Sequence, residues 1–401
     1  MIFNTWLFAL FAVVLFAFYS RVRTFWVRNA FLIAAGIIFY LASVPVYILL
    51  VLGLAVATYA CAVALGRIAP ERKLTRQWTL ALGIAANVGV LGFFKYGKLF
   101  GTSLGLCHSG CSGVLANLIV PLAISFFTFE FIHFLVDVYY GKIANFKTIE
   151  FFVFALFFPT MVAGPIKRFQ NFAPQLRRFA HVHSLQVAAG VYRVLLGLAK
   201  KSIIADSMTP LTQPLLTPGP LYSSGDYWVA AFAYSAKIYF DFTGYSDIAI
   251  GLAELLGFRI VENFDRPYWA RSISNFWQRW HISLSSWIRD YLFIPLGGSR
   301  RKLARTLLNL TLVMAVAGLW HGANWHFVVW GLFQGAGLAI HRAYSLIMPK
   351  AVLARWGSSS ALNYLSVATT FLFVTLGWVL FASPSLATAG TVYSHLLSFG
   401  K

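Results

Sequence analysis

Long apolar stretches separated by short basic connectors dominate the pattern along the chain. No Asp, Glu, Lys or Arg occurs in residues 1–20, 29–66, 306–341 or 356–400. Because a bilayer core about 30 Å thick needs roughly 20 apolar residues in a helix, the run 29–66 is long enough to cross twice. The pattern therefore predicts an all-α, polytopic integral membrane protein that forms a single domain over residues 1–401.

The apolar runs also predict where individual helices lie. Residues 1–20 lack a basic leader and a small-residue cleavage site, so we expect a retained first helix. Pro45 marks the turn of a helical hairpin. Residues 150–166 are apolar but contain Pro159, Gly164 and Pro165, which predicts a broken or re-entrant segment. The remaining spans are expected near 30–43, 46–65, 79–94, 118–139, 228–256, 306–320, 325–346 and 361–382, giving about ten or more helices in all.

Charge adds an orientation to this picture. The chain has 32 Lys and Arg against 12 Asp and Glu, a net charge of +20. These basic residues cluster in the connectors, which is typical of cytoplasmic loops, and no basic block alternates with aromatic residues as in a nucleic-acid-binding module. We therefore expect a bilayer partner and no nucleic acid. The loop near 95–117 would be extracytoplasmic, where Cys107 and Cys111 could form a disulfide or remain thiols; a metal site there lacks a clear fourth ligand.

Polar residues inside apolar runs are the candidates for chemistry, because each is costly unless it is paired or functional. Asp241 and Asp247 are two such carboxylates. They suit acid–base work, cation binding or ordinary pairing with a basic side chain. A secondary transporter that uses them is one functional alternative.

Two histidines are the other candidates. His281 lies in the segment 275–290, whose spacing predicts an amphipathic helix with Trp277, His281 and Ser285 on one face. His321 lies in the middle of the charge-free run 306–341, closely flanked by glycines. An imidazole at that depth works or is hydrogen-bonded, because burial would otherwise be costly.

The sequence contains no nucleophile elbow, phosphate loop, zinc-protease motif or dinucleotide fingerprint. A transporter and a buried general-base enzyme therefore remain open, and residue spacing alone does not choose between them.

Seven blocks in order over roughly 120–335 carry a resemblance to a known family. The chain resembles the membrane-bound O-acyltransferase (MBOAT) family, in its bacterial branch that acylates cell-surface polymers such as alginate and teichoic acid. The blocks are Pro121–Phe129, Asp137–Gly141, Phe158–Ile166, Tyr239–Asp247, Phe276–Ser285, Arg289–Gly298 and Gly318–Gly322.

This resemblance implies a bowl of many helices in the bacterial inner membrane. It also implies an enzyme that moves a small acyl group, most directly acetyl, from a cytoplasmic thioester to hydroxyls of a cell-surface polysaccharide or a partner protein. The donor would be acetyl-CoA or an acyl-carrier protein, with no bound cofactor and no metal. A separate extracytoplasmic acyltransferase would complete the transfer.

The same resemblance implies catalytic roles for His321, as general base, and for His281, which would orient the reactants or polarise the thioester carbonyl. Imidazole suits the first role because its pKa lies near working pH. Arg279 and Arg289 would bind donor phosphates or lipid headgroups. The complete set of predicted substrate-binding residues is Asn324, Trp320, Trp277, Ser285, Arg279, Arg289 and Asp241.

Two further alternatives stay open at this point. The acyl group could be D-alanyl, because the chain length is closer to that of the D-alanyl type. The chain could also be a non-catalytic scaffold that recruits a secreted acyltransferase, in which case neither histidine would matter.

Overall fold

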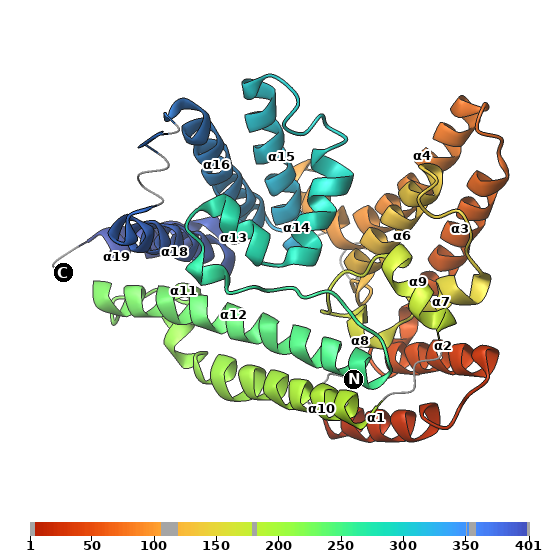
Figure 1. Ribbon diagram of the computed structural model, residues 1–401. Helices are drawn as coiled ribbons and strands as arrows, with labels where there is room; N and C mark the ends of the chain where they lie inside the picture. The colour runs from red at the N-terminus through yellow and green to blue at the C-terminus, as the bar shows by residue number, and fades with distance from the viewer. Residues whose placement is uncertain (1–4, 106–118, 179–182, 350, 353–357, 399–401) are drawn as a thin grey trace. The chain divides into compact units, whose positions relative to one another are not determined.

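The computed structural model describes residues 5–105, 119–178, 183–349, 351–352 and 358–398 (Figure 1). Within these ranges the regular structure is helical, and strand pairing is limited to the single bridge between Phe264 and Trp280. The all-α prediction is therefore confirmed. Cys107 and Cys111, and with them the question of a disulfide, lie outside the described residues.

The helices gather into two compact units. The first comprises Met1–Leu198 with Tyr245–Val261, and the second comprises Ala199–Gly244 with Glu262–Lys401. The long helix α12, Ser224–Leu255, contributes to both. The prediction of one domain over residues 1–401 stays a prediction.

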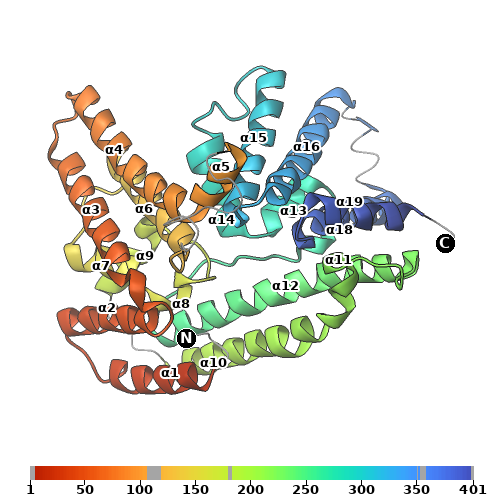
Figure 2. The ribbon, with the colours of Figure 1, turned by 180° about the vertical axis from the view of Figure 1, so that it is seen from behind.

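The first unit contains most of the N-terminal helices (Figures 1 and 2). Pro45 begins a short 3₁₀ turn, Pro45–Tyr47, between two of them, so the chain turns at the predicted position. The elements are α1 (Trp6–Tyr19), α2 (Phe25–Leu41), α3 (Ile48–Arg67), α4 (Lys73–Leu91), α5 (Gly97–Ser103), α6 (Ile124–Tyr139), α7 (Thr148–Ala155), α8 (Phe158–Met161), α9 (Phe169–Arg177) and α10 (Ser184–Leu198).

One predicted span of this unit differs from its helices, and one predicted break is found. The span expected near 79–94 is longer, because α4 continues through a π-helical turn, Gly92–Tyr96, into α5. Lys95 is accommodated inside this run because its ammonium donates to Ser125 Oγ (3.1 Å). The segment 150–166 is broken as predicted, since α7 ends at Ala155 and α8 begins at Phe158.

A ladder of buried polar side chains joins α6 to the chain that follows α8. Glu130 accepts two hydrogen bonds from Lys167 Nζ, at 2.7 and 2.8 Å, and both side chains are at most 5% exposed. One turn further, His133 Nε2 accepts from the Phe169 N–H (3.1 Å), and Asp137 accepts from Gln170 (2.8 Å). The ladder holds the non-helical segment 162–168 in place, because breaking it would leave a buried charge uncompensated.

The second unit contains the C-terminal helices. Its elements are the π-helical Ala199–Ala205, η4 (Pro210–Thr212), α11 (Gln213–Leu216), η5 (Pro267–Trp269), α13 (Ile273–Arg279), α14 (Ile282–Ile288), the π-helical Arg289–Phe293, α15 (Leu303–His321), α16 (Trp325–Ile347), α18 (Ser360–Ala382) and α19 (Leu386–Leu397).

Helices α15 and α16 form a tight antiparallel hairpin in which the two backbones touch (Figures 1 and 2). A Cβ atom added to Gly318 would lie 2.1 Å from Phe327 O, and one added to Gly331 would lie 2.2 Å from Met314 O. Only glycine permits this approach. Beside the hairpin lies an aromatic core that includes Trp277, Trp280, Trp330 and Trp378.

Four helical runs are long and apolar enough to cross a membrane: Pro45–Arg67, Lys73–Ser103, Leu303–His321 and Ser360–Ala382. Two shorter apolar helices, Trp6–Tyr19 and Phe25–Leu41, add to them. These lengths and compositions agree with the predicted polytopic membrane protein.

Candidate active site

His281 sits at a break between two short helices, where its backbone is strained. The predicted amphipathic helix over 275–290 is wrong, because α13 ends at Arg279 and α14 begins at Ile282. The break arises because Trp280 pairs with Phe264 as in an antiparallel sheet, and His281 then adopts a left-handed conformation with φ +44°. Such backbone strain in a non-glycine residue occurs most often at functional sites.

The same pairing brings Asn263 against His281. The Asp265 N–H donates to Arg279 O (3.0 Å), and the Ile282 N–H donates to Asn263 O (2.9 Å). Asn263 Oδ1 then accepts from the Ser283 N–H (3.2 Å) and the Ser283 hydroxyl (2.7 Å), and it lies 3.3 Å from His281 Nδ1. These donors identify Oδ1 as an acceptor, so the neutral His281 carries its proton on Nδ1.

The remaining ring nitrogen of His281, Nε2, is therefore a lone-pair acceptor. Burial, and after it the charge of the neighbouring His321, lowers the pKa of His281 well below its usual 6.5. In the described part of the chain, this buried Nε2 has no hydrogen-bond partner. It is available to accept a proton or a hydrogen bond from a bound reactant.

His321 is the last residue of α15, so it stands where the helix meets the turn into α16. Its imidazole packs against Trp320 (4.8 Å between ring centroids), Trp330 (5.2 Å) and Phe381 (5.1 Å). Trp320 also contacts His281, at 6.0 Å. The two imidazoles, 40 residues apart in the sequence (321 − 281), therefore lie against the same indole.

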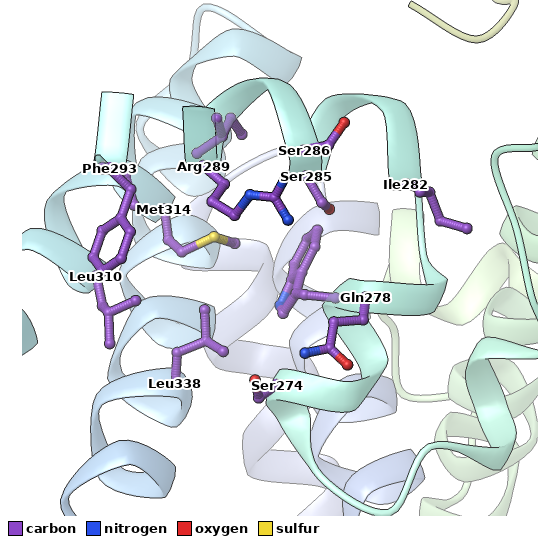
Figure 3. A pocket seen from close by; sticks show the side chains of 13 residues that line it. Ser274, Gln278, Ile282, Ser285, Ser286, Arg289, Phe293, Leu310, Met314 and Leu338 are labelled. Carbon is purple, nitrogen blue, oxygen red and sulfur yellow. The ribbon is translucent and has the colours of Figure 1, made fainter. Parts of the chain in front are cut away.

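The same unit contains a cavity of about 310 Å³, although neither histidine is among its lining residues. Ile282, the neighbour of His281, lines it, and so does Trp277, which contacts Trp330 (5.9 Å). Figure 3 shows Arg289 and Ser285 directed into the cavity from α14 and the following π-helical turn. The cavity is mainly apolar, with polar groups supplied by Ser274, Gln278, Ser285, Ser286 and Arg289.

Trp277 lines this cavity and carries an unpaired hydrogen-bond donor. Its side chain is 9% exposed, and its buried indole N–H has no acceptor among the described residues. A buried donor without a partner is destabilising, and such groups in native proteins commonly await a ligand or water.

The other predicted site residues are spread more widely. Arg289 lines the cavity and pairs with Asp290 (2.9 Å), whereas Arg279 lines a different cavity, described below. Ser285 lines the cavity while its hydroxyl donates to Trp280 O (3.1 Å). Asn324 lies in the exposed turn between α15 and α16, where its side chain accepts from the His326 N–H (3.3 Å) and caps α16.

The two aspartates of α12 are ion-paired. Asp241 accepts from Lys201 Nζ (2.8 Å), which also binds Asp206 (2.7 Å). Asp247 accepts from Arg193 (3.1 Å). Each carboxylate thus has the basic partner that buried carboxylates usually find.

Asn263 is the site residue that sequence reasoning missed. It lies 18 positions before His281 and belongs to no pattern that the sequence alone makes visible. Among the described residues, no group of three His, Cys, Asp or Glu side chains is arranged to hold a metal ion.

The helical fold agrees with the comparison to known proteins. The sequence profile of the MBOAT, membrane-bound O-acyltransferase family, matches residues 74–381. The chain belongs to this family of acyltransferases.

Among individual relatives, the chain is 40% identical to the probable alginate O-acetylase AlgI of Pseudomonas aeruginosa over 380 residues, which covers 93% of this chain and 70% of the relative. It is 34% identical to the peptidoglycan O-acetyltransferase of Helicobacter pylori, covering 89% of this chain and 71% of the relative. The teichoic acid D-alanyltransferase of Streptococcus thermophilus is 32% identical, covering 56% of this chain and 57% of the relative.

Proposed function

We propose that this protein transfers an acetyl group from a cytoplasmic thioester, acetyl-CoA or an acyl-carrier protein, to hydroxyls of a cell-surface polysaccharide. The observation that carries the proposal is the pair His281 and His321 on Trp320, with a cavity lined by Ile282, the neighbour of His281, in the same unit. The protein would work in the bacterial inner membrane. An extracytoplasmic acyltransferase would be its partner and could receive the acetyl group first.

Acetyl is favoured over D-alanyl by the extent of similarity. The relatives named for O-acetylation match about nine tenths of this chain, whereas two D-alanyltransferases match 56% and 66% of it. Transfer of a D-alanyl group to a teichoic-acid-like polymer is the second candidate. The transporter alternative has lost its support, because both aspartates on which it rested are held in ion pairs.

In the proposed reaction, His321 is the general base. It takes the proton of the acceptor hydroxyl while that oxygen attacks the thioester carbonyl carbon. The carbon–sulfur bond then breaks, and the leaving thiolate takes the proton back from the imidazolium. His321 suits this role because it stands at a helix end and is only partly buried.

His281 is proposed to orient the reactants through Nε2. Because its Nδ1 proton is directed at Asn263, neutral His281 offers an acceptor and not a donor on the other side. It can therefore align a hydroxyl or stabilise the neighbouring imidazolium. Polarising the thioester carbonyl requires a hydrogen-bond donor, so we assign this part of the predicted role of His281 to another residue.

Trp277 is the proposed donor to the thioester carbonyl. Its side chain lines the cavity and its buried indole N–H has no acceptor among the described residues, while charge develops on the carbonyl oxygen as the bond to the acceptor forms. A pre-placed donor in a water-poor site stabilises that charge strongly.

The direct test is the His321→Ala variant in a strain that acetylates its polymer through this protein. We expect acetylation to fall by about a thousandfold or more while the protein still reaches the membrane. Purified protein supplied with radiolabelled acetyl-CoA and the acceptor polymer gives the same comparison in vitro. Acetylation at the wild-type rate by His321→Ala would refute the role of this histidine, and label entering the polymer only with a D-alanyl donor would favour the second candidate.

A further inference from the structure

A second cavity in the same unit is lined by three arginines. It has a volume of about 740 Å³. Arg266, Arg271 and Arg279 line it, together with the polar residues Asn275 and Asn363. No Asp or Glu is among its lining residues, so three positive charges face one space without a carboxylate.

The local fold explains how these arginines converge. Arg279 ends α13, and its carbonyl accepts from Asp265, the residue before Arg266. Arg266 has a left-handed backbone, φ +45°, which starts the turn Pro267–Trp269 and returns the chain toward α13. Arg271 follows that turn and precedes α13, so all three side chains come from the continuous segment 266–279.

The guanidinium groups are not engaged elsewhere. The structure gives none of the three a salt bridge or side-chain hydrogen bond within the described part of the chain, although Arg177, Arg193 and Arg289 all pair with carboxylates. Clustered like charges repel each other unless an anion lies between them, so the arrangement is better suited to a bound anion than to an empty cavity.

Phosphate is the anion that this chemistry fits best. Planar guanidinium groups bind phosphate oxygens in bidentate fashion, and the side-chain amides of Asn275 and Asn363 can add neutral donors. Trp269 and Tyr364, which are 63% and 68% exposed, form an aromatic wall for the remainder of the ligand.

The side of the membrane also favours phosphate. Helix α15 begins directly after the basic residues Arg300, Arg301 and Lys302, which are typical of the cytoplasmic side. Because α16 runs antiparallel to α15, it returns to that side, and Ser360, which begins α18 soon afterwards, lines the cavity. Phosphate compounds are available there, whereas a secreted polymer is not.

We propose that Arg266, Arg271 and Arg279 form a phosphate-binding site distinct from the first cavity. Its ligand is either the phosphate end of a phosphopantetheine thioester or the headgroup of an anionic phospholipid. The first source rests on the proposed function, and the second does not.

The experiment uses the full chain in nanodiscs of phosphatidylcholine, which carries no net charge. Coenzyme A and pantetheine, which lacks both the phosphates and the adenosine of coenzyme A, are titrated against wild type, Arg271→Gln and Arg279→Gln. Spin-labelled phosphatidylglycerol measures lipid binding in parallel. The matched control is Arg305→Gln, an exposed arginine of the same unit that does not line the cavity.

If the ligand is the thioester donor, each pocket substitution weakens coenzyme A binding by about tenfold or more and leaves pantetheine binding unchanged. The Arg305→Gln variant binds coenzyme A like wild type. The KM for acetyl-CoA then rises with little change in kcat. If the ligand is a lipid headgroup, the same variants lose phosphatidylglycerol and leave coenzyme A unaffected. Arg279→Lys, which keeps the charge without the planar fork, restores binding only in part.

The proposal is overturned if the pocket variants bind coenzyme A and phosphatidylglycerol like wild type. It is also overturned if Arg305→Gln weakens binding as much as the pocket variants do. Binding is repeated with His321→Ala protein, in which the site should remain intact. If His321→Ala loses acetylation but still binds coenzyme A, the phosphate site and the catalytic role of His321 are independent. A failure of one proposal can then be told apart from a failure of the other. Size-exclusion profiles of every variant verify that it is folded.

Discussion

Asn263 Oδ1 lies 3.3 Å from His281 Nδ1 and fixes which nitrogen of that imidazole carries the proton. The amide is itself held by Ser283, from its backbone N–H and its hydroxyl. The backbone pairing between residues 263–265 and 279–282 thus places the amide that orients the His281 imidazole.

Asn263→Leu should therefore reduce turnover without preventing donor binding. Without the acceptor at Nδ1, His281 can rotate or change tautomer, and a misplacement of about 1 Å can lower a rate by about a hundredfold. The expected result is a lower kcat with little change in KM, measured as acetyl transfer by purified protein. The exposed Asn145→Ala serves as control, and an unchanged kcat in Asn263→Leu would contradict the positioning role.

Trp277→Phe tests the proposed donor to the thioester carbonyl. Phenylalanine keeps an aromatic ring in the wall of the cavity but removes the indole N–H. Loss of a single oxyanion donor typically lowers kcat by about a hundredfold or more, and we expect an effect of that order here. Phe substitution at Trp325, an exposed tryptophan that does not line the cavity, should have little effect. Equal rates for the two variants would exclude Trp277 from this role.

Acid should destabilise the protein through His281. The folded protein keeps this residue neutral because its pKa is lowered, whereas the unfolded chain binds a proton near pH 6.5. Its contribution to stability is therefore complete above pH 6.5 and decreases as the pH falls toward the folded pKa, by about 1.4 kcal/mol per pH unit. Thermal unfolding in detergent at about pH 7.5 and pH 5.5 should show a smaller acid shift for His281→Gln than for wild type. Identical shifts would mean that His281 is not held neutral.

The buried pair Glu130–Lys167 should be far more sensitive to single than to double substitution. Lys167→Met leaves an unpaired carboxylate in the core and should lower the free energy of unfolding by about 3–5 kcal/mol. Adding Glu130→Met should recover much of that loss, because neither charge then remains. Thermal unfolding of both variants is compared with Lys98→Met, which removes an exposed lysine of the same unit. A double variant less stable than Lys167→Met would contradict this account.

Gly318→Ala should disrupt the α15–α16 hairpin, because its Cβ would lie 2.1 Å from Phe327 O. Gly89→Ala in α4 is the matched control, since nothing lies within 4 Å of its added Cβ. The control should be neutral or stabilising by up to about 1 kcal/mol, in line with helix propensity. Gly318→Ala should instead lower the unfolding temperature and, because His321 is three residues away, reduce acetyl transfer. Equal unfolding temperatures for the two variants would show that the hairpin can separate without loss.

The sequence predicted the helices well where charge-free runs are long, as in α3 and α18, because length and apolarity decide the matter there. It also singled out His321, since an imidazole is conspicuous in a run without charges. Periodicity failed at 275–290 because it assumes a continuous helix. The left-handed backbone of His281 breaks that helix, and Arg279 and Arg289 consequently line different cavities.

Asn263 was beyond reach of the sequence for a related reason. Its relation to His281 depends on a two-residue antiparallel pairing, which has neither the length nor the alternation that identifies a strand. The sequence predicted that Asp241 and Asp247 could pair with basic side chains. It did not identify Lys201 and Arg193 as the partners, because these contacts depend on how the helices pack.

The glycine contacts between α15 and α16 have a mechanical consequence. The backbones contact each other at Gly318, Gly331 and Gly335, so no layer of side chains separates the two helices. We therefore expect the hairpin to be rigid up to its end at His321. Any movement that admits a donor or releases a product must come from the flanking side chains or from the short helices around His281. The proposed general base, His321, would thus remain stationary while the entrance to the site changes around it.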